Sequence, residues 1–161
     1  IVDMPPGTGD IQLTMAQQVP LTAAVVVTTP QDLAIADAQK GIAMFNKVNI
    51  PVLGLVENMS FYQCTECGHK DYVFAKDGGN LLAERYNLPL LGALPLDVRI
   101  REHAGSGEPL LVSEPDSPLS DVYREMARAV SFELATTVPV AADQGRNIKG
   151  DPIAFNPLTD S

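Results

Sequence analysis

The sequence predicts an α/β protein built on a parallel sheet flanked by helices. Short apolar runs suited to buried strands alternate with stretches whose apolar residues recur at helical spacing. Such alternation favours parallel strands joined by right-handed helical crossovers. With 161 residues, 45% of them hydrophobic, the chain can fill one core of ordinary size. We therefore expect one domain over residues 1–136, followed by a polar, mobile tail over 137–161.

The expected elements follow in order from the N-terminus. Ile1–Asp3 is expected to be the end of a buried strand, and the prolines and glycines after it predict a loop up to Asp10. The first half then continues with a short helix at 11–18, a strand at 23–28 buried on both faces, a helix at 32–45 with Asp32 as its N-cap, and a strand at 51–58. The second half is expected to contain a small β-element at 72–74, a helix at 79–86, a strand at 90–94, a helical turn at 97–103, a loop at 105–118 and an amphipathic helix at 119–136.

Several expected strands end in residues suited to binding a nucleotide. Because the carboxyl ends of parallel strands meet at one edge of a sheet, Asp3, Asn58 and the Pro95–Asp97 segment are expected to share a rim with 28–31. An aspartate at a strand end before a glycine-bearing loop suits a magnesium nucleotide, and the Asn58 amide suits an adenine edge. Two simpler interpretations stay open, namely Asn58 as a turn residue and Asp97 as a helix N-cap.

Cys64 and Cys67 are the only cysteines of the chain, and their spacing suits joint binding of a soft metal. Haem attachment fails because Gly68 separates the pair from His69, and a loop position disfavours a thioredoxin-like redox pair. Zinc and an iron–sulfur cluster both remain, and each normally needs four protein ligands. Four thiolates therefore require two chains, with the two cysteine pairs facing each other across a two-fold axis.

Charge and composition narrow the partners and the compartment. Twenty acidic and eleven basic residues give a net charge of −9, which disfavours binding to nucleic acid and to anionic membranes. No apolar segment approaches the length that spans a bilayer, and no signal peptide opens the sequence. The expected location is the cytoplasm.

Together these motifs resemble the C-terminal half of the Mrp/ApbC iron–sulfur cluster carriers, which are MinD-like ATPases with a deviant P-loop. The resemblance covers about residues 1–135, and the joint occurrence of its motifs is specific. Those motifs are Asp3-Met4-Pro5-Pro6-Gly7-Thr8-Gly9-Asp10, Thr28-Thr29-Pro30-Gln31, Glu57-Asn58-Met59-Ser60 with the cysteine pair behind it, and Leu94-Pro95-Leu96-Asp97. The resemblance implies a P-loop NTPase fold and a cytosolic homodimer that hydrolyses ATP and delivers a labile [4Fe–4S] cluster to apoprotein acceptors.

The resemblance also implies roles for single residues. On the catalytic side, Asp3 matches the magnesium-associated acid, and Gly7 lies in the switch loop near the γ-phosphate. On the cofactor-binding side, Asn58 matches the adenine-side residue, and Pro95 and Asp97 belong to a further motif at the nucleotide rim.

The cluster ligands implied by the resemblance are Cys64 and Cys67. The chain departs from the family pattern because the glycine-rich, lysine-containing phosphate loop and its strand are absent. We therefore expect a fragment with exposed sheet edges, and ATP hydrolysis only in the intact protein. The alternative is a MinD-like regulatory module whose cysteine pair binds a structural zinc at the dimer interface.

Overall fold

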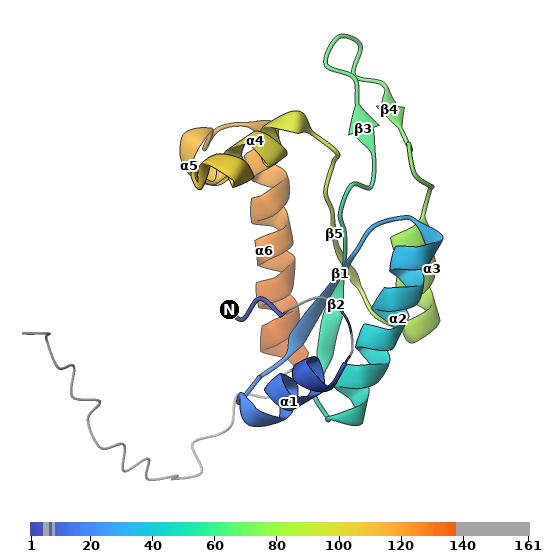
Figure 1. Ribbon diagram of the computed structural model, residues 1–161. Coiled ribbons are helices and arrows are strands. Elements are labelled where there is room, and N and C mark those ends of the chain that lie inside the picture. The colour runs from blue at the N-terminus through green and yellow to red at the C-terminus, as the bar shows by residue number, and fades with distance from the viewer. Residues whose placement is uncertain (5–6, 8, 138–161) are drawn as a thin grey trace, which may run out of the picture.

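The computed structural model describes residues 1–4, 7 and 9–137 (Figure 1). Its centre is a three-stranded parallel sheet in the order β1-β2-β5, formed by β1 (Ala24–Thr28), β2 (Val52–Glu57) and β5 (Leu90–Ala93). Each connection between these strands contains a helix, as parallel neighbours require. The helices are α1 (Asp10–Gln18), α2 (Asp32–Lys47), α3 (Gly78–Tyr86), α4 (Val98–Ser106), α5 (Leu110–Ser113) and α6 (Pro118–Thr137).

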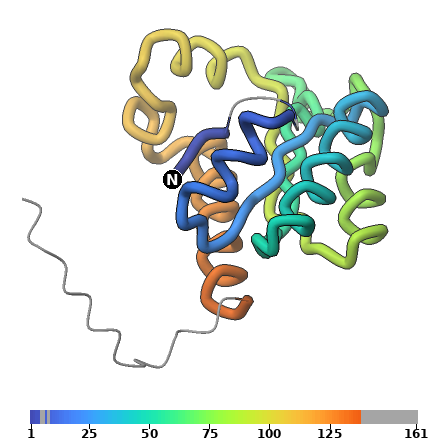
Figure 2. The backbone as a smooth tube through the Cα atoms, turned by 60° about the horizontal axis from the view of Figure 1, so that its bottom comes forward, coloured from blue at the N-terminus to red at the C-terminus, as the bar shows by residue number. Residues whose placement is uncertain are grey.

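Helices cover both faces of the sheet, and each face has its own apolar core. Helices α2 and α3 lie side by side on one face, whereas α6 covers the other (Figure 2). Consecutive residues of β2 point to opposite cores, with Leu55 facing α2 and α3 and Val56 facing α6. Both side chains are almost completely buried, so β2 is the central strand of a sheet enclosed on two sides.

A small antiparallel hairpin projects beyond the carboxyl end of the parallel sheet (Figure 1). It consists of β3 (Tyr62–Gln63) and β4 (Lys70–Asp71) and belongs to the connection from β2 to α3. The residues at its tip are the cysteine motif. We call residues 61–77 the cysteine hairpin.

Most expected elements are confirmed to within one or two residues, but two expectations about strands were wrong. Ile1–Asp3 lies outside any strand and is exposed, because no strand in the described part of the chain pairs with it. The small β-element lies at β3 and β4 instead of at 72–74, since pairing across the tight cysteine loop determines where the ladder forms.

Three further local expectations were also wrong. Asp32 is the first residue of α2, and Gln31 occupies the N-cap position. The segment 105–118 is not all loop, because α4 runs to Ser106 and α5 forms a short helix within it. β1 is not buried on both faces: Val27 is 61% exposed, because β1 lies at an edge of the described sheet.

Helix α6 ends the described part of the chain, at Thr137. The rest of the predicted tail, 138–161, lies outside the described residues, so the domain boundary at 136 stays a prediction. Among the described helices, none is sufficiently long and apolar to cross a membrane.

Candidate functional site

The carboxyl ends of β1, β2 and β5 form one rim, as the strand order requires. Thr28 pairs with Glu57, and Glu57 in turn pairs with Ala93. The chain stays in register just past the strands, because the Asn58 amide donates to the Thr28 carbonyl (2.7 Å) and the Leu94 amide donates to the Glu57 carbonyl (2.8 Å). The structure thus brings together the segments that contain Asn58, Pro95 and Asp97.

Asp3 and Gly7 are not joined to this rim by an interaction within the described residues. Asp3 is exposed, and neither a hydrogen bond nor an ion pair links it to another described side chain. Gly7 has a φ of +100°, a conformation that favours glycine over residues with a side chain. Gly9 then precedes α1, and its carbonyl accepts the Leu13 amide (3.1 Å). The magnesium and phosphate roles of Asp3 and Gly7 remain predictions.

Asn58 closes a turn at the end of β2. Its Oδ1 accepts the Met59 backbone amide (2.9 Å), and Met59 has a left-handed φ of +54°. Asn58 is half-buried, so its side chain reaches the surface at the rim. The turn interpretation therefore holds, and an adenine contact through the remainder of the carboxamide stays a prediction.

Asp97 caps the N-terminus of α4, and its side chain is already engaged by Arg99. Its Oδ1 accepts the Arg99 backbone amide (2.9 Å), and its Oδ2 lies 2.9 Å from an Arg99 guanidinium nitrogen. The hydrogen bond from the Arg99 side chain is the main reason that the pKa of Asp97 is lowered. Pro95 is buried between β5 and α4, where it shapes the backbone of the rim. Cofactor binding by Asp97 and Pro95 remains a prediction.

Glu57 belongs to one of the motifs named above, but no role was predicted for it. The residue is only 4% exposed, at the carboxyl end of β2. Oε1 accepts the Ser60 hydroxyl (2.5 Å), and Oε2 accepts the Gly79 backbone amide in the first turn of α3. The sequence did contain a signal, because Glu57 is a lone acid at the end of an otherwise apolar strand. A carboxyl group buried there requires hydrogen-bond donors from elsewhere in the fold.

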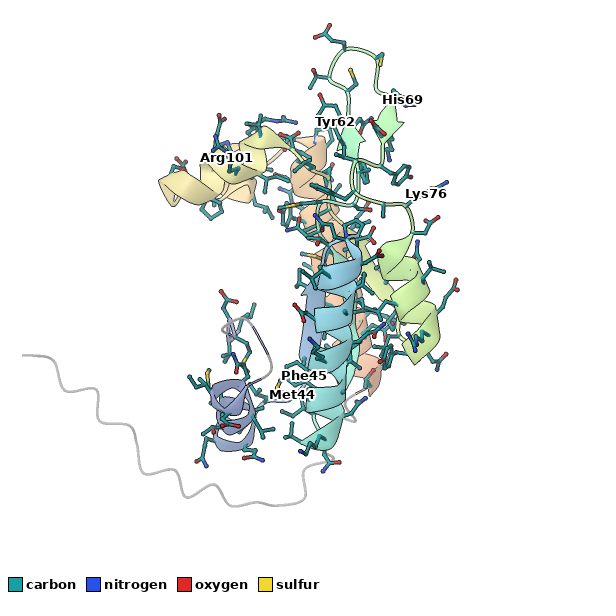
Figure 3. The ribbon with its side chains drawn as sticks, turned by 45° about the vertical axis from the view of Figure 1, so that its right-hand side comes forward. Met44, Phe45, Tyr62, His69, Lys76 and Arg101 are labelled. Carbon is teal, nitrogen blue, oxygen red and sulfur yellow. The ribbon has the colours of Figure 1, made fainter. Side chains whose placement is uncertain are left out.

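The cysteine pair lies on the loop that joins β3 to β4. The Cys64 amide donates to the His69 carbonyl (2.9 Å), and the Gly68 amide donates to the Cys64 carbonyl (2.9 Å). Gly68 has a φ of +71°, which permits the tight reversal. Figure 3 places Tyr62 and His69 on the projecting hairpin, away from the body of the molecule. The pair therefore lies at the tip of an arm.

Both thiols are free, and the surroundings of Cys64 favour its thiolate form. Cys64 is half-buried and Cys67 is exposed. The pKa of Cys64 is lowered, chiefly by the Cys67 backbone amide and then by the Glu66 amide and the Cys67 side chain, so the thiolate that binds metals is favoured. Within the described residues, no group of three or more His, Cys, Asp or Glu residues is arranged to hold a metal ion. The metal-ligand role of Cys64 and Cys67 remains a prediction, and among the described residues of this chain no third His, Cys, Asp or Glu is grouped with them to hold a metal ion.

A family model and individual relatives both show similarity to iron–sulfur cluster carrier and transfer proteins. The family described as ParA, NUBPL iron-transfer P-loop NTPase, matches residues 1–131. The iron–sulfur cluster carrier protein of Haemophilus influenzae is 54% identical over 134 residues, which are 83% of this chain and 36% of that protein. The iron–sulfur cluster transfer protein NUBPL of Mus musculus is 50% identical over 137 residues, or 85% of this chain and 43% of that protein. The chain spans less than half the length of these relatives.

Solved structures share the arrangement of the sheet and its helices. A nucleotide-binding protein from Archaeoglobus fulgidus in complex with ADP matches with a TM-score of 0.62 and 34% identity, over 72% of this chain and 46% of that one. The cell division ATPase MinD of Pyrococcus furiosus matches with a TM-score of 0.54 and 23% identity, over 69% of this chain and 43% of that one. The second likeness concerns the fold alone.

Proposed function

Because this chain belongs to the ParA family of NUBPL-type iron-transfer P-loop NTPases, we propose that it is the C-terminal part of an iron–sulfur cluster carrier. The intact protein is a homodimer that binds and hydrolyses ATP and transfers a [4Fe–4S] cluster to apoprotein acceptors. Two relatives named as an iron–sulfur carrier and a transfer protein support this proposal. The parallel sheet flanked by helices is part of a MinD-like P-loop NTPase fold, which agrees with it.

One observation carries the proposal, namely a pair of free thiols at the tip of the cysteine hairpin. Thiolates are the ligands of iron–sulfur clusters, and Cys64 and Cys67 are both free to bind. Two copies of the hairpin meeting at a two-fold axis supply the four thiolates that a cluster requires. The cluster is a cargo of the protein, and an exposed site between two chains suits its release.

The nucleotide binds at the rim from which the cysteine hairpin rises. Asp3 acts with magnesium, Gly7 approaches the γ-phosphate, and Asn58, with Pro95 and Asp97, contacts the nucleotide on its adenine side. The ADP complex of the Archaeoglobus relative supports nucleotide binding at this fold. The 161 residues contain no glycine-rich lysine loop, so by themselves they lack the charge stabilisation that phosphoryl transfer needs.

The proposed location is the cytoplasm, and neither nucleic acid nor a membrane is a proposed partner. Two free cysteines agree with a reducing compartment, and the net charge of −9 disfavours binding to polyanions.

A second candidate is a regulatory MinD-like module that holds structural zinc between two chains. The observation that favours it is the ligand set itself, since four thiolates bind zinc as readily as they bind a cluster. The two candidates differ in what the cysteine pair takes up.

Anaerobic reconstitution with iron and sulfide tests the proposal. We expect the chain to acquire the broad visible absorption of an iron–sulfur cluster, and Cys64→Ala and Cys67→Ala each to abolish it. Thr65→Ala is the matched control, because Thr65 is an exposed residue between the two ligands and should leave the absorption intact. Tight zinc binding without any cluster uptake would instead support the regulatory module.

A further inference from the structure

One buried carboxylate touches both ends of the cysteine hairpin. The chain enters the hairpin from Ser60, whose hydroxyl donates to Glu57 Oε1 (2.5 Å). It leaves the hairpin into α3, where the Gly79 amide donates to Glu57 Oε2. The two donors are 19 residues apart in sequence, yet they meet on one side chain at the end of β2. In Figure 1 the hairpin rises from this end of the sheet, with α3 directly following it.

We propose that Glu57 is a positioning residue for the cysteine pair, because its carboxylate fastens both ends of the cysteine hairpin to the end of β2. An effect of Glu57 on cluster binding rests on the proposed function. The hydrogen bonds by which Glu57 holds the ends of the hairpin do not depend on that function. In this role Glu57 acts through the Ser60 hydroxyl and the Gly79 backbone amide that it holds. It is followed directly by Asn58, so the arm and the predicted adenine contact share one support.

The two ends of the hairpin depend on Glu57 to different degrees. At the entrance, backbone hydrogen bonds provide further support, because the Ser60 amide donates to Leu94 (2.9 Å) and the Leu96 amide donates to Phe61 (2.7 Å). At the C-terminal end of the hairpin, the chain instead continues through Gly78 and Gly79, which pack closely against Pro30 and Glu57. A loss of Glu57 should therefore release the exit more than the entrance.

The glycines at the exit permit the close approach that this contact needs. A Cβ added to Gly79 would lie 2.7 Å from Glu57 Oε2, and one added to Gly78 would lie 2.9 Å from the Pro30 carbonyl oxygen. Both distances are too short for a real Cβ atom. Pro30 and Glu57 are themselves buried, so a side chain at either glycine would have to displace a packed neighbour. Gly79 is thus matched to the buried acid at the end of β2, and Gly78 to the backbone of Pro30.

Hydrogen exchange of the full 161-residue chain tests the proposal without any cluster. We expect Glu57→Ala to speed exchange in the first turn of α3, residues 79–82, by about tenfold or more, because the hydrogen bond from the Gly79 amide to the buried Glu57 carboxyl group is lost. Exchange in β1 should stay unchanged. Glu57→Gln should rescue most of the effect, since its carbonyl oxygen accepts the Gly79 amide and its amide donates to the Ser60 hydroxyl.

Gly79→Ala provides a second, independent arm. Its methyl group would push the carboxylate away while Glu57 stays in the sequence, so it should speed exchange at the same residues. Unchanged exchange at 79–82 in folded Glu57→Ala would overturn the proposal. If Glu57→Ala does not fold, unchanged exchange in Gly79→Ala would overturn it instead.

Reconstitution with iron and sulfide separates this proposal from the proposed function. We expect Glu57→Ala to take up less cluster than the parent chain although both cysteines are present, and Glu57→Gln to restore the uptake. If the parent chain takes up no cluster, the proposed function fails, while the exchange result still decides the role of Glu57.

Discussion

Asp97 combines two roles that substitution can separate. It caps α4 through the Arg99 backbone amide and pairs with the Arg99 guanidinium. Asp97→Asn keeps a capping oxygen and loses the ion pair, so we expect it to cost about 0.5 to 1 kcal/mol of unfolding free energy at neutral pH. Asp97→Ala loses both and should cost about 1 kcal/mol more. Chemical denaturation of the three proteins checks this order, and equal stabilities would contradict it.

The difference in stability between the parent protein and Asp97→Asn should depend on pH. Because Arg99 lowers the pKa of Asp97 in the folded protein, the ionised carboxylate is favoured by folding. Its contribution is fully present above the unfolded pKa, about 3.9, and is lost as the pH falls through the lower folded value. The advantage of Asp97 over Asp97→Asn should therefore shrink in acid, and an advantage that grew in acid would contradict the assignment.

Single residues also mark the limits of prediction from this sequence. Asn58 as a turn residue and Asp97 as an N-cap were predictable, because both roles depend on neighbours in the chain. The role of Glu57 was not, since its second partner, Gly79, is 22 residues away. The partners of a buried acid can be identified only from the fold when they are distant in the sequence.

At the scale of elements, two glycines have opposite expected effects when replaced by alanine. A Cβ at Gly54 in β2 would lie 2.6 Å from the Pro89 carbonyl oxygen, so Gly54→Ala should cost about 1 to 3 kcal/mol. Gly41 lies within α2 and a Cβ there would meet nothing within 4 Å, so Gly41→Ala should gain about 0.5 to 1 kcal/mol. Thermal unfolding of both variants checks the prediction, and destabilisation by Gly41→Ala would contradict it.

The elements that the sequence predicted are those with strong local periodicity. The long amphipathic α6 and the apolar β2 were expected within two residues of their observed bounds. The β3–β4 hairpin was misplaced because two-residue strands carry no periodic signal, and their position depends on pairing across a loop. α5 was missed for a similar reason, since four residues are too few for a helical pattern.

In the whole molecule, the carboxyl-end rim of the sheet and the cysteine hairpin lie on the same side. The rim combines the ends of β1, β2 and β5, and the cysteine hairpin rises from it. The fold class followed from alternation of strands and helices, and the family from the joint occurrence of the rim and cysteine motifs. The proposed pairing of two cysteine hairpins is a relation between chains, which neither the alternation of elements nor the spacing of the cysteines specifies.

Native mass spectrometry of the anaerobically reconstituted chain shows whether two chains share one cluster. We expect a species with the mass of two chains and one [4Fe–4S] cluster, which Cys64→Ala and Cys67→Ala abolish and Thr65→Ala retains. A single chain that carries its own cluster, or a dimer that contains only zinc, would contradict it.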